Sequence, residues 1–219
     1  VENRMNKTFI FKELDREGLE TLEAIAAADA FNAWMYAVTS QHLSGNILEI
    51  GSGIGNISTF FLRDARSLML SDIRENYCGY LKTHFKHYKT CLGVRQIDLI
   101  HPNFEVEYAD LLESFEGVFA LNVIEHIEND ALALANCYKL LKKGGHLVIL
   151  VPAYQWLYNE FDRNLAHFRR YTEGGLRERF LAQNFEVLHS QYFNFAAIGG
   201  WWFSGNILRK KVIPKGQMK

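Results

Sequence analysis

Short apolar runs alternate with longer helical stretches along most of the chain from residue 46 onward. The apolar runs predict strands, and the stretches between them place apolar residues at helical spacing. Predicted strands cover 47–50, 67–71, 93–97, 117–121, 146–151 and 185–191, and predicted helices cover 56–63, 75–88, 129–142 and 173–183. Strands joined by helical crossovers form parallel sheets. The pattern therefore predicts an α/β fold with a doubly wound, mostly parallel sheet.

The segment before residue 46 lacks this alternation of strands and helices. Apolar residues at helical spacing, such as Leu19, Leu22 and Trp34, predict N-terminal helices ahead of the sheet. No repeat or low-complexity linker divides the chain, so we expect a single domain. Its parts are a helical leader at 1–44, a cofactor-binding core at 45–152, a lid inserted after strand five at 153–172, and a C-terminal helix, strand and apolar tail at 173–219.

Composition narrows the function classes. With 219 residues, 48% hydrophobic and 14% aromatic, the chain can bury the core of one domain. A net charge of −1 offers no overall attraction to nucleic acid. The cysteines Cys78, Cys91 and Cys137 lack the paired spacing of a disulfide framework or a zinc site. No apolar run reaches the roughly 18 residues that span a bilayer, and no secretory signal is evident. We therefore expect a cytoplasmic protein.

The most specific segment is a glycine-rich loop after the first predicted strand. Gly51, Gly53 and Gly55 alternate with other residues, which allows a tight turn and close approach of a ligand to the backbone. A dinucleotide fingerprint would place a small residue at the position of Asn56. A purely structural turn is the alternative interpretation.

Acidic residues follow the next two predicted strands. Asp72 lies after the second, where a carboxylate can accept two hydrogen bonds from a ribose diol. This position suits an adenosine-containing ligand, although a surface aspartate at a strand end would look the same. Asp98 lies after the third predicted strand.

Three motifs together resemble the class I S-adenosylmethionine-dependent methyltransferases of small-molecule type. They are the E-x-G-x-G-x-G pattern at 49–55, the NVIEHI segment at 122–127 and the LLKKGGHLVI segment at 140–149. The resemblance covers about residues 45–190 and implies a Rossmann-like methyltransferase fold. It also implies S-adenosylmethionine as methyl donor and S-adenosylhomocysteine as product, but it does not specify the acceptor.

The resemblance implies a set of cofactor-binding residues. Glu49 suits a cofactor that carries an ammonium group and a sulfonium. Asp98 competes with Asp110 and Leu111 for the adenine, and we prefer the latter pair. The expected residues are Glu49, Gly51, Ser52, Gly53, Gly55, Asp72, Ile73, Asp110, Leu111 and Asn122.

The loop at 153–172 is predicted to cover the substrate. It exceeds the length of about 12–15 residues beyond which loops are usually functional or disordered, and its aromatic content argues against disorder. Its Asp162 and its HFRRY run at 167–171 resemble a D…GHfRRYt segment in a subset of these enzymes, several of them associated with glycan or lipid metabolism. Ala166 stands where that pattern has glycine.

Within and beside this lid we expect the acceptor-binding and catalytic residues. Tyr154, Arg169 and Arg170 are expected to bind the acceptor, the arginines through a carboxylate or phosphate. His126 is expected to face the substrate, and His167 or Tyr171 to act as general base. The alternatives are that His126 ties a loop and that Asp162 pairs with an arginine and merely fastens the lid.

The remaining expectations concern partners. The apolar tail at 193–203, with basic residues at 209–211, suits a peripheral membrane contact, a homodimer contact or a flap on the core. No catechol-type set of carboxylates is evident, so we expect no metal. The Asn-Pro-Pro-aromatic and Pro-Cys motifs of nucleic-acid methylation are absent, which favours a small-molecule, sugar or lipid-linked acceptor. The alternatives are an NAD-type oxidoreductase, opposed by Asn56 and the Glu125-His126 pair, and a cofactor-binding protein without catalysis.

Overall fold

The computed structural model describes residues 29–193. The leader up to residue 28 and the tail from residue 194, with the predictions made for them, lie outside the described residues. Five parallel strands form one sheet in the order β3-β2-β1-β4-β5. They are β1 (Ile47–Ile50), β2 (Leu68–Asp72), β3 (Cys91–Gln96), β4 (Phe115–Leu121) and β5 (Leu141–Leu150). The predicted α/β fold with a parallel sheet is thereby confirmed.

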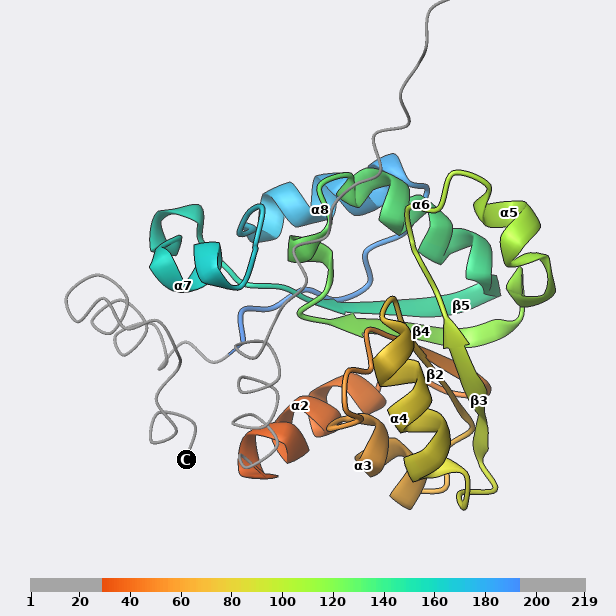
Figure 1. The fold of residues 1–219 in the computed structure, drawn as a ribbon. Coiled ribbons are helices and arrows are strands. Elements are labelled where there is room, and N and C mark those ends of the chain that lie inside the picture. The colour runs from red at the N-terminus through yellow and green to blue at the C-terminus, as the bar shows by residue number, and fades with distance from the viewer. Residues whose placement is uncertain (1–28, 194–219) are drawn as a thin grey trace, which may run out of the picture.

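Helices cover both faces of this sheet (Figure 1). One face carries α2 (Asp29–Ser40), α3 (Ser58–Arg63) and α4 (Glu75–Phe85). The other face carries α5 (Phe104–Glu107), α6 (Asp130–Leu140) and α8 (Glu173–Ala182). A short helix, α7 (Glu160–Asn164), stands apart from both layers at one end of the sheet. Three 3-10 turns, η1 (Ala109–Leu111), η2 (Ile124–His126) and η3 (Gln155–Leu157), complete the described elements.

Strand β1 lies at the centre and divides the core into two layers. All four of its residues are buried, as expected for a parallel strand covered on both faces. Ile47 packs with Phe61 and Phe85 in one apolar cluster, whereas Leu48 packs with Ala133 in the other. Alternation along one strand therefore holds the two helical layers to the same sheet.

The register brings several loops to one edge of the sheet. Ile50, the last residue of β1, pairs with Ser71 of β2 on one side and with Ala120 of β4 on the other. Because all strands are parallel, the segments after β1, β2 and β4 leave the sheet at this carboxyl edge. Ligands of open α/β sheets bind at this edge.

Several predicted elements differ from the structure, two of them for a clear reason. The helix predicted to reach residue 142 ends at Leu140, because Leu141 is already extended and pairs with Phe115 of β4. The strand predicted at 185–191 is not formed. Its aromatic residues and their neighbours instead pack side chain against side chain, with Phe185 against Tyr138 and Phe193 stacked on Trp34. In the described part of the chain, no helix combines the length and apolar character needed to cross a bilayer.

Candidate active site

The glycine loop packs between two neighbouring segments and leaves no room for side chains at two of its positions. Gly51 has a φ of +72°, and a Cβ there would lie 2.5 Å from the Val123 side chain, which follows β4. Gly55 has a φ of +84°, and a Cβ there would lie 2.3 Å from the Phe85 ring at the end of α4. Both the backbone conformation and the packing therefore require glycine.

Asp72 at the end of β2 is bonded to this loop. Its Oδ2 accepts a hydrogen bond from the backbone N–H of Gly53 at 2.9 Å, and its Oδ1 accepts one from that of Arg74 at 2.9 Å. Ser52 adds a second tie, because its Oγ accepts from the Ser71 N–H at 3.1 Å. The carboxylate is buried, and burial raises the pKa of Asp72. The structure thus brings Ser52, Gly53 and Asp72 together, as predicted, and Ile73 follows directly.

Glu49 lies under the loop and not on its surface. It is buried within β1, where its carboxylate accepts a hydrogen bond from the Ser58 hydroxyl at the start of α3. Burial raises the pKa of Glu49 to about 7, although the hydrogen bonds from Ser58 and Ser52 act in the opposite direction. Burial therefore favours the protonated form of Glu49 more than it would for an exposed glutamate.

The two candidates for the adenine differ in position. Asp98 follows β3 closely, and its Oδ1 accepts a hydrogen bond from the Ile100 N–H at 2.9 Å. Asp110 lies in η1, before β4, and forms an exposed ion pair with Arg95 at 2.6 Å. Leu111 is buried in the apolar core. Asp98 thus follows β3 more directly, while Arg95 near the end of β3 holds Asp110, and the preference for Asp110 and Leu111 stays a prediction.

The segment after β4 carries the remaining cofactor candidate. Asn122 has a φ of +55° and donates its backbone N–H to the Leu150 carbonyl at 2.8 Å. Asparagine tolerates this left-handed conformation better than most residues. Its side chain is exposed directly after β4, where the sequence predicted it to flank the cofactor.

Next along the chain, η2 presents a buried acid and a histidine to the lid. Glu125 is 0% exposed, and neither carboxylate oxygen has a hydrogen-bond partner among the described residues. Burial raises the pKa of Glu125 to about 8 and lowers that of His126 to about 3. The rings of His126 and His167 meet edge to face with centroids 4.6 Å apart.

Asp162 holds the lid together. Its carboxylate accepts hydrogen bonds from His167 Nδ1 and Arg170 Nε, both at 2.8 Å, and from the Asn159 N–H at 3.0 Å. Asn159 in turn caps the first turn of α7. The structure confirms that Asp162 pairs with an arginine, as the alternative interpretation expected.

Asp130 at the start of α6 anchors the end of the lid. Its carboxylate pairs with Arg169 Nη1 and Arg179 Nε, both at 2.8 Å, and accepts a hydrogen bond from the Tyr171 hydroxyl at 2.9 Å. Burial raises the pKa of Tyr171, and the contact with Asp130 acts in the same direction. Arg169, Arg170 and Tyr171 therefore have structural partners, and their predicted roles as acceptor ligands and general base stay predictions.

The outer side of the lid is aromatic. Tyr154 has a φ of +64° and stacks on Tyr192 with ring centroids 4.8 Å apart. Trp156 is 65% exposed and Phe168 is 50% exposed. The predicted contact of Tyr154 with an acceptor stays a prediction.

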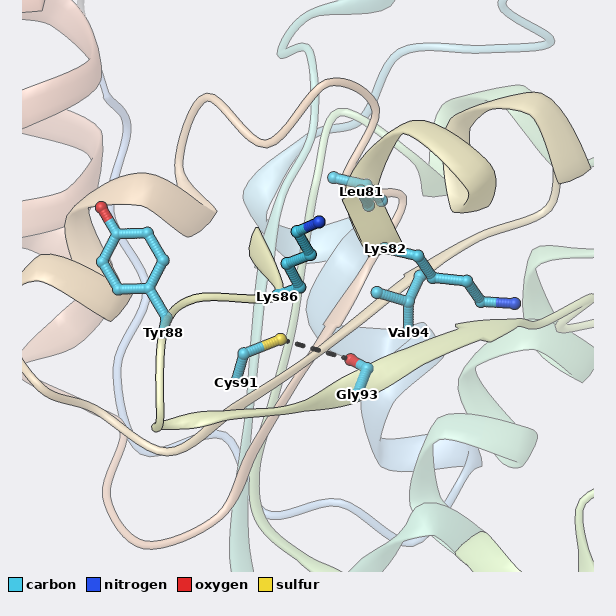
Figure 2. A pocket seen from close by; sticks show the side chains of 7 residues that line it. All are labelled: Leu81, Lys82, Lys86, Tyr88, Cys91, Gly93 and Val94. Carbon is cyan, nitrogen blue, oxygen red and sulfur yellow. Dashed lines mark hydrogen bonds between the residues drawn. The ribbon is translucent and has the colours of Figure 1, made fainter. Parts of the chain in front are cut away.

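A separate surface hollow lies at the opposite edge of the sheet (Figure 2). It is lined by the end of α4 and the segment that follows it, with Leu81 and Lys86, and by the first residues of β3, with Cys91 and Val94. The hollow thus lies toward the amino end of β3. None of the site residues described above lines it.

Comparison with known proteins agrees with this geometry. A family model described as a methyltransferase domain matches residues 13–190. Over 120 residues the chain is 30% identical to the hybrid PKS-NRPS synthetase thnA of Trichoderma harzianum, covering 53% of this chain and 3% of that protein. Over 103 residues it is 27% identical to the ubiquinone biosynthesis O-methyltransferase of Rhizobium etli, covering 47% of this chain and 39% of that protein. The chain thus spans less than half the length of either relative.

A solved structure shares the fold. A Bacillus halodurans protein classed as a methyltransferase superposes with a TM-score of 0.59 at 21% identity, covering 80% of each chain. The family model covers well over half of the chain, and the parallel sheet has the fold class that the resemblance implied. The chain therefore belongs to the class I S-adenosylmethionine-dependent methyltransferases.

Proposed function

We propose that this chain binds S-adenosylmethionine at the carboxyl edge of its sheet and transfers the methyl group to a small-molecule, sugar or lipid-linked acceptor. The observation that carries the proposal is the hydrogen bond from the Gly53 N–H to the Asp72 carboxylate. It joins the glycine loop after β1 to the acid after β2, and both groups meet a nucleoside in open α/β sheets.

The chemistry of the donor set supports this cofactor. Asp72 has further acceptor capacity on its two oxygens for a ribose diol. Glu49 is buried beneath the loop, and a ligand with two cationic groups would favour its ionised form. We assign the adenine amino group to Asp98, which follows β3, and the methionine part to the loop and Asn122. The sulfonium carries an already activated methyl group, so the protein's task is to position the acceptor and exclude water.

The lid supports an acceptor site beside η2. The Phe168 N–H donates a hydrogen bond to the Glu125 carbonyl at 2.8 Å, which fastens the lid to the segment after β4. The exposed rings of Trp156 and Phe168 offer apolar contact surface. The Rhizobium etli relative is named for ubiquinone biosynthesis, which supports a small molecule as the acceptor here.

A labelling experiment tests the proposal. The purified chain is incubated with methyl-labelled S-adenosylmethionine and a panel of hydroxylated aromatic, polyketide-like, sugar and lipid acceptors. We expect label in one acceptor class, its loss in Asp72→Ala, and its retention in Glu105→Gln, which removes one exposed negative charge at the ion pair with Lys139. Cofactor binding without transfer to any acceptor would favour the non-catalytic alternative.

A further inference from the structure

Three potential metal ligands meet where the lid contacts η2. Glu125 and His126 come from η2, and His167 comes from the lid after β5, the strand next to β4 in the sheet. One ligand atom from each of the three lies within 4.8 Å of the others. We propose that Glu125, His126 and His167 form a binding site for a divalent transition-metal ion. The sequence alone led us to expect no metal, because it does not show that these residues meet.

Glu125 is a buried carboxylate without a hydrogen-bond donor among the residues that the structure describes. Its side chain is 0% exposed, and both oxygens lack a hydrogen-bond donor in the described part of the chain. Buried carboxylates are normally paired, hydrogen-bonded or bound to a metal. Arg170 of the lid attracts the Glu125 carboxylate electrostatically, but its guanidinium is bonded to Asp162. A cation between Glu125 and the two imidazoles would satisfy the carboxylate.

Both histidines are held as metal ligands usually are. His167 Nδ1 is bonded to Asp162 Oδ1 at 2.8 Å, which leaves Nε2 to offer its lone pair. His126 makes a hydrogen bond with the backbone of Leu165. Metal-binding imidazoles commonly donate their second nitrogen to a carboxylate or a backbone carbonyl in this manner. The outer groups therefore fix both rings before any ion binds.

The ligand set selects the class of metal. Two imidazoles with one carboxylate suit Zn²⁺, Fe²⁺, Mn²⁺ or Co²⁺, whereas Mg²⁺ and Ca²⁺ prefer oxygen ligands alone. Ligands at about 2.0–2.2 Å from a tetrahedral ion lie about 3.3–3.6 Å apart, so a cluster within 4.8 Å closes by up to roughly 1.5 Å on binding. Three protein ligands also leave at least one position for water or for an acceptor oxygen.

Zinc binding to the metal-free full chain tests this site. After treatment with a chelator, titration calorimetry with Zn²⁺ should show one ion per chain. Glu125→Leu and His126→Asn should each weaken that binding by at least about 100-fold, the upper range seen when only an outer partner of a ligand is lost. Glu125→Gln, which keeps the shape of the side chain, should weaken it by at least about tenfold and covers the case in which the leucine variant does not fold.

The control is His87→Ala, which removes an exposed histidine beyond α4 and should leave Zn²⁺ affinity unchanged. Cobalt in place of zinc should give d–d absorption without a sulfur-to-metal band. Absence of stoichiometric binding, unchanged affinity in a folded Glu125 variant, or a sulfur band from the cysteines would overturn the proposal. Because the readout is binding of the metal alone, the result does not depend on methyl transfer.

Discussion

The backbone N–H of Gly53 lies 2.9 Å from Oδ2 of Asp72, so the acid at the end of β2 is fixed against the glycine loop after β1. Removing the carboxylate in Asp72→Ala should weaken S-adenosylmethionine binding by about 1.5–3 kcal/mol, the value of hydrogen bonds to a charged group. Equilibrium dialysis with labelled cofactor measures the change. Unchanged affinity in a folded variant would place the ribose elsewhere.

Two aspartate variants test which residue binds the adenine. Asp98→Ala should weaken cofactor binding by about 1–2 kcal/mol, because it removes the acceptor that follows β3. Asp110→Ala should leave the affinity unchanged, since Asp110 forms an exposed ion pair with Arg95. Equilibrium dialysis of both variants with labelled cofactor measures the two affinities. The reverse order of effects would restore Asp110 as the adenine ligand.

The raised pKa of Glu49 should make the free energy of unfolding depend on pH. Its pKa is raised from 4.5 to about 7 in the folded chain, so the folded state keeps a proton that the unfolded state loses. Stability from this group is therefore fully present below about pH 4.5 and is lost as pH rises to about 7, by roughly 3 kcal/mol in total. Urea unfolding at several pH values should show this loss in the wild type and a smaller one in Glu49→Gln. Parallel pH profiles for the two proteins would contradict the assignment.

The lid offers a matched pair of arginines for a stability measurement. Arg170 is bonded to buried Asp162 and its side chain is only 6% exposed, whereas Arg163 pairs with Glu160 and is 59% exposed. Arg170→Ala should cost about 3–5 kcal/mol, because it leaves a buried charge without its partner. Arg163→Ala should cost about 0–1 kcal/mol. Denaturant unfolding compares them, and equal costs would show that the Asp162 network does not hold the lid.

Local pattern predicted the sheet well because each buried strand carries its own signal. Ile47 and Leu48 place apolar side chains on opposite faces of the sheet, and Asp72 ends its strand at the position expected for a ribose ligand. Side-chain packing explains why the strand predicted at 185–191 does not form. Phe185 begins the segment predicted as a strand, but its ring packs against Tyr138 on α6 and the segment pairs with no strand.

The lid could be located but not interpreted from the sequence. Arg169, Arg170 and Tyr171 suit an anionic acceptor as well as they suit a buried carboxylate, and only the fold shows that Asp130 and Asp162 receive them. Asp162 with the HFRRY run was the available signal for that network. No local pattern indicates that Glu125 is buried without a partner, because this depends on how the lid returns to η2.

Titration calorimetry with S-adenosylhomocysteine and with NAD distinguishes the two classes of cofactor. We expect one equivalent of S-adenosylhomocysteine to bind per chain, Asp72→Ala to weaken this binding, and NAD to give no saturable heat. Saturable binding of NAD without any binding of S-adenosylhomocysteine would contradict the cofactor assignment, and with it the proposed methyl transfer.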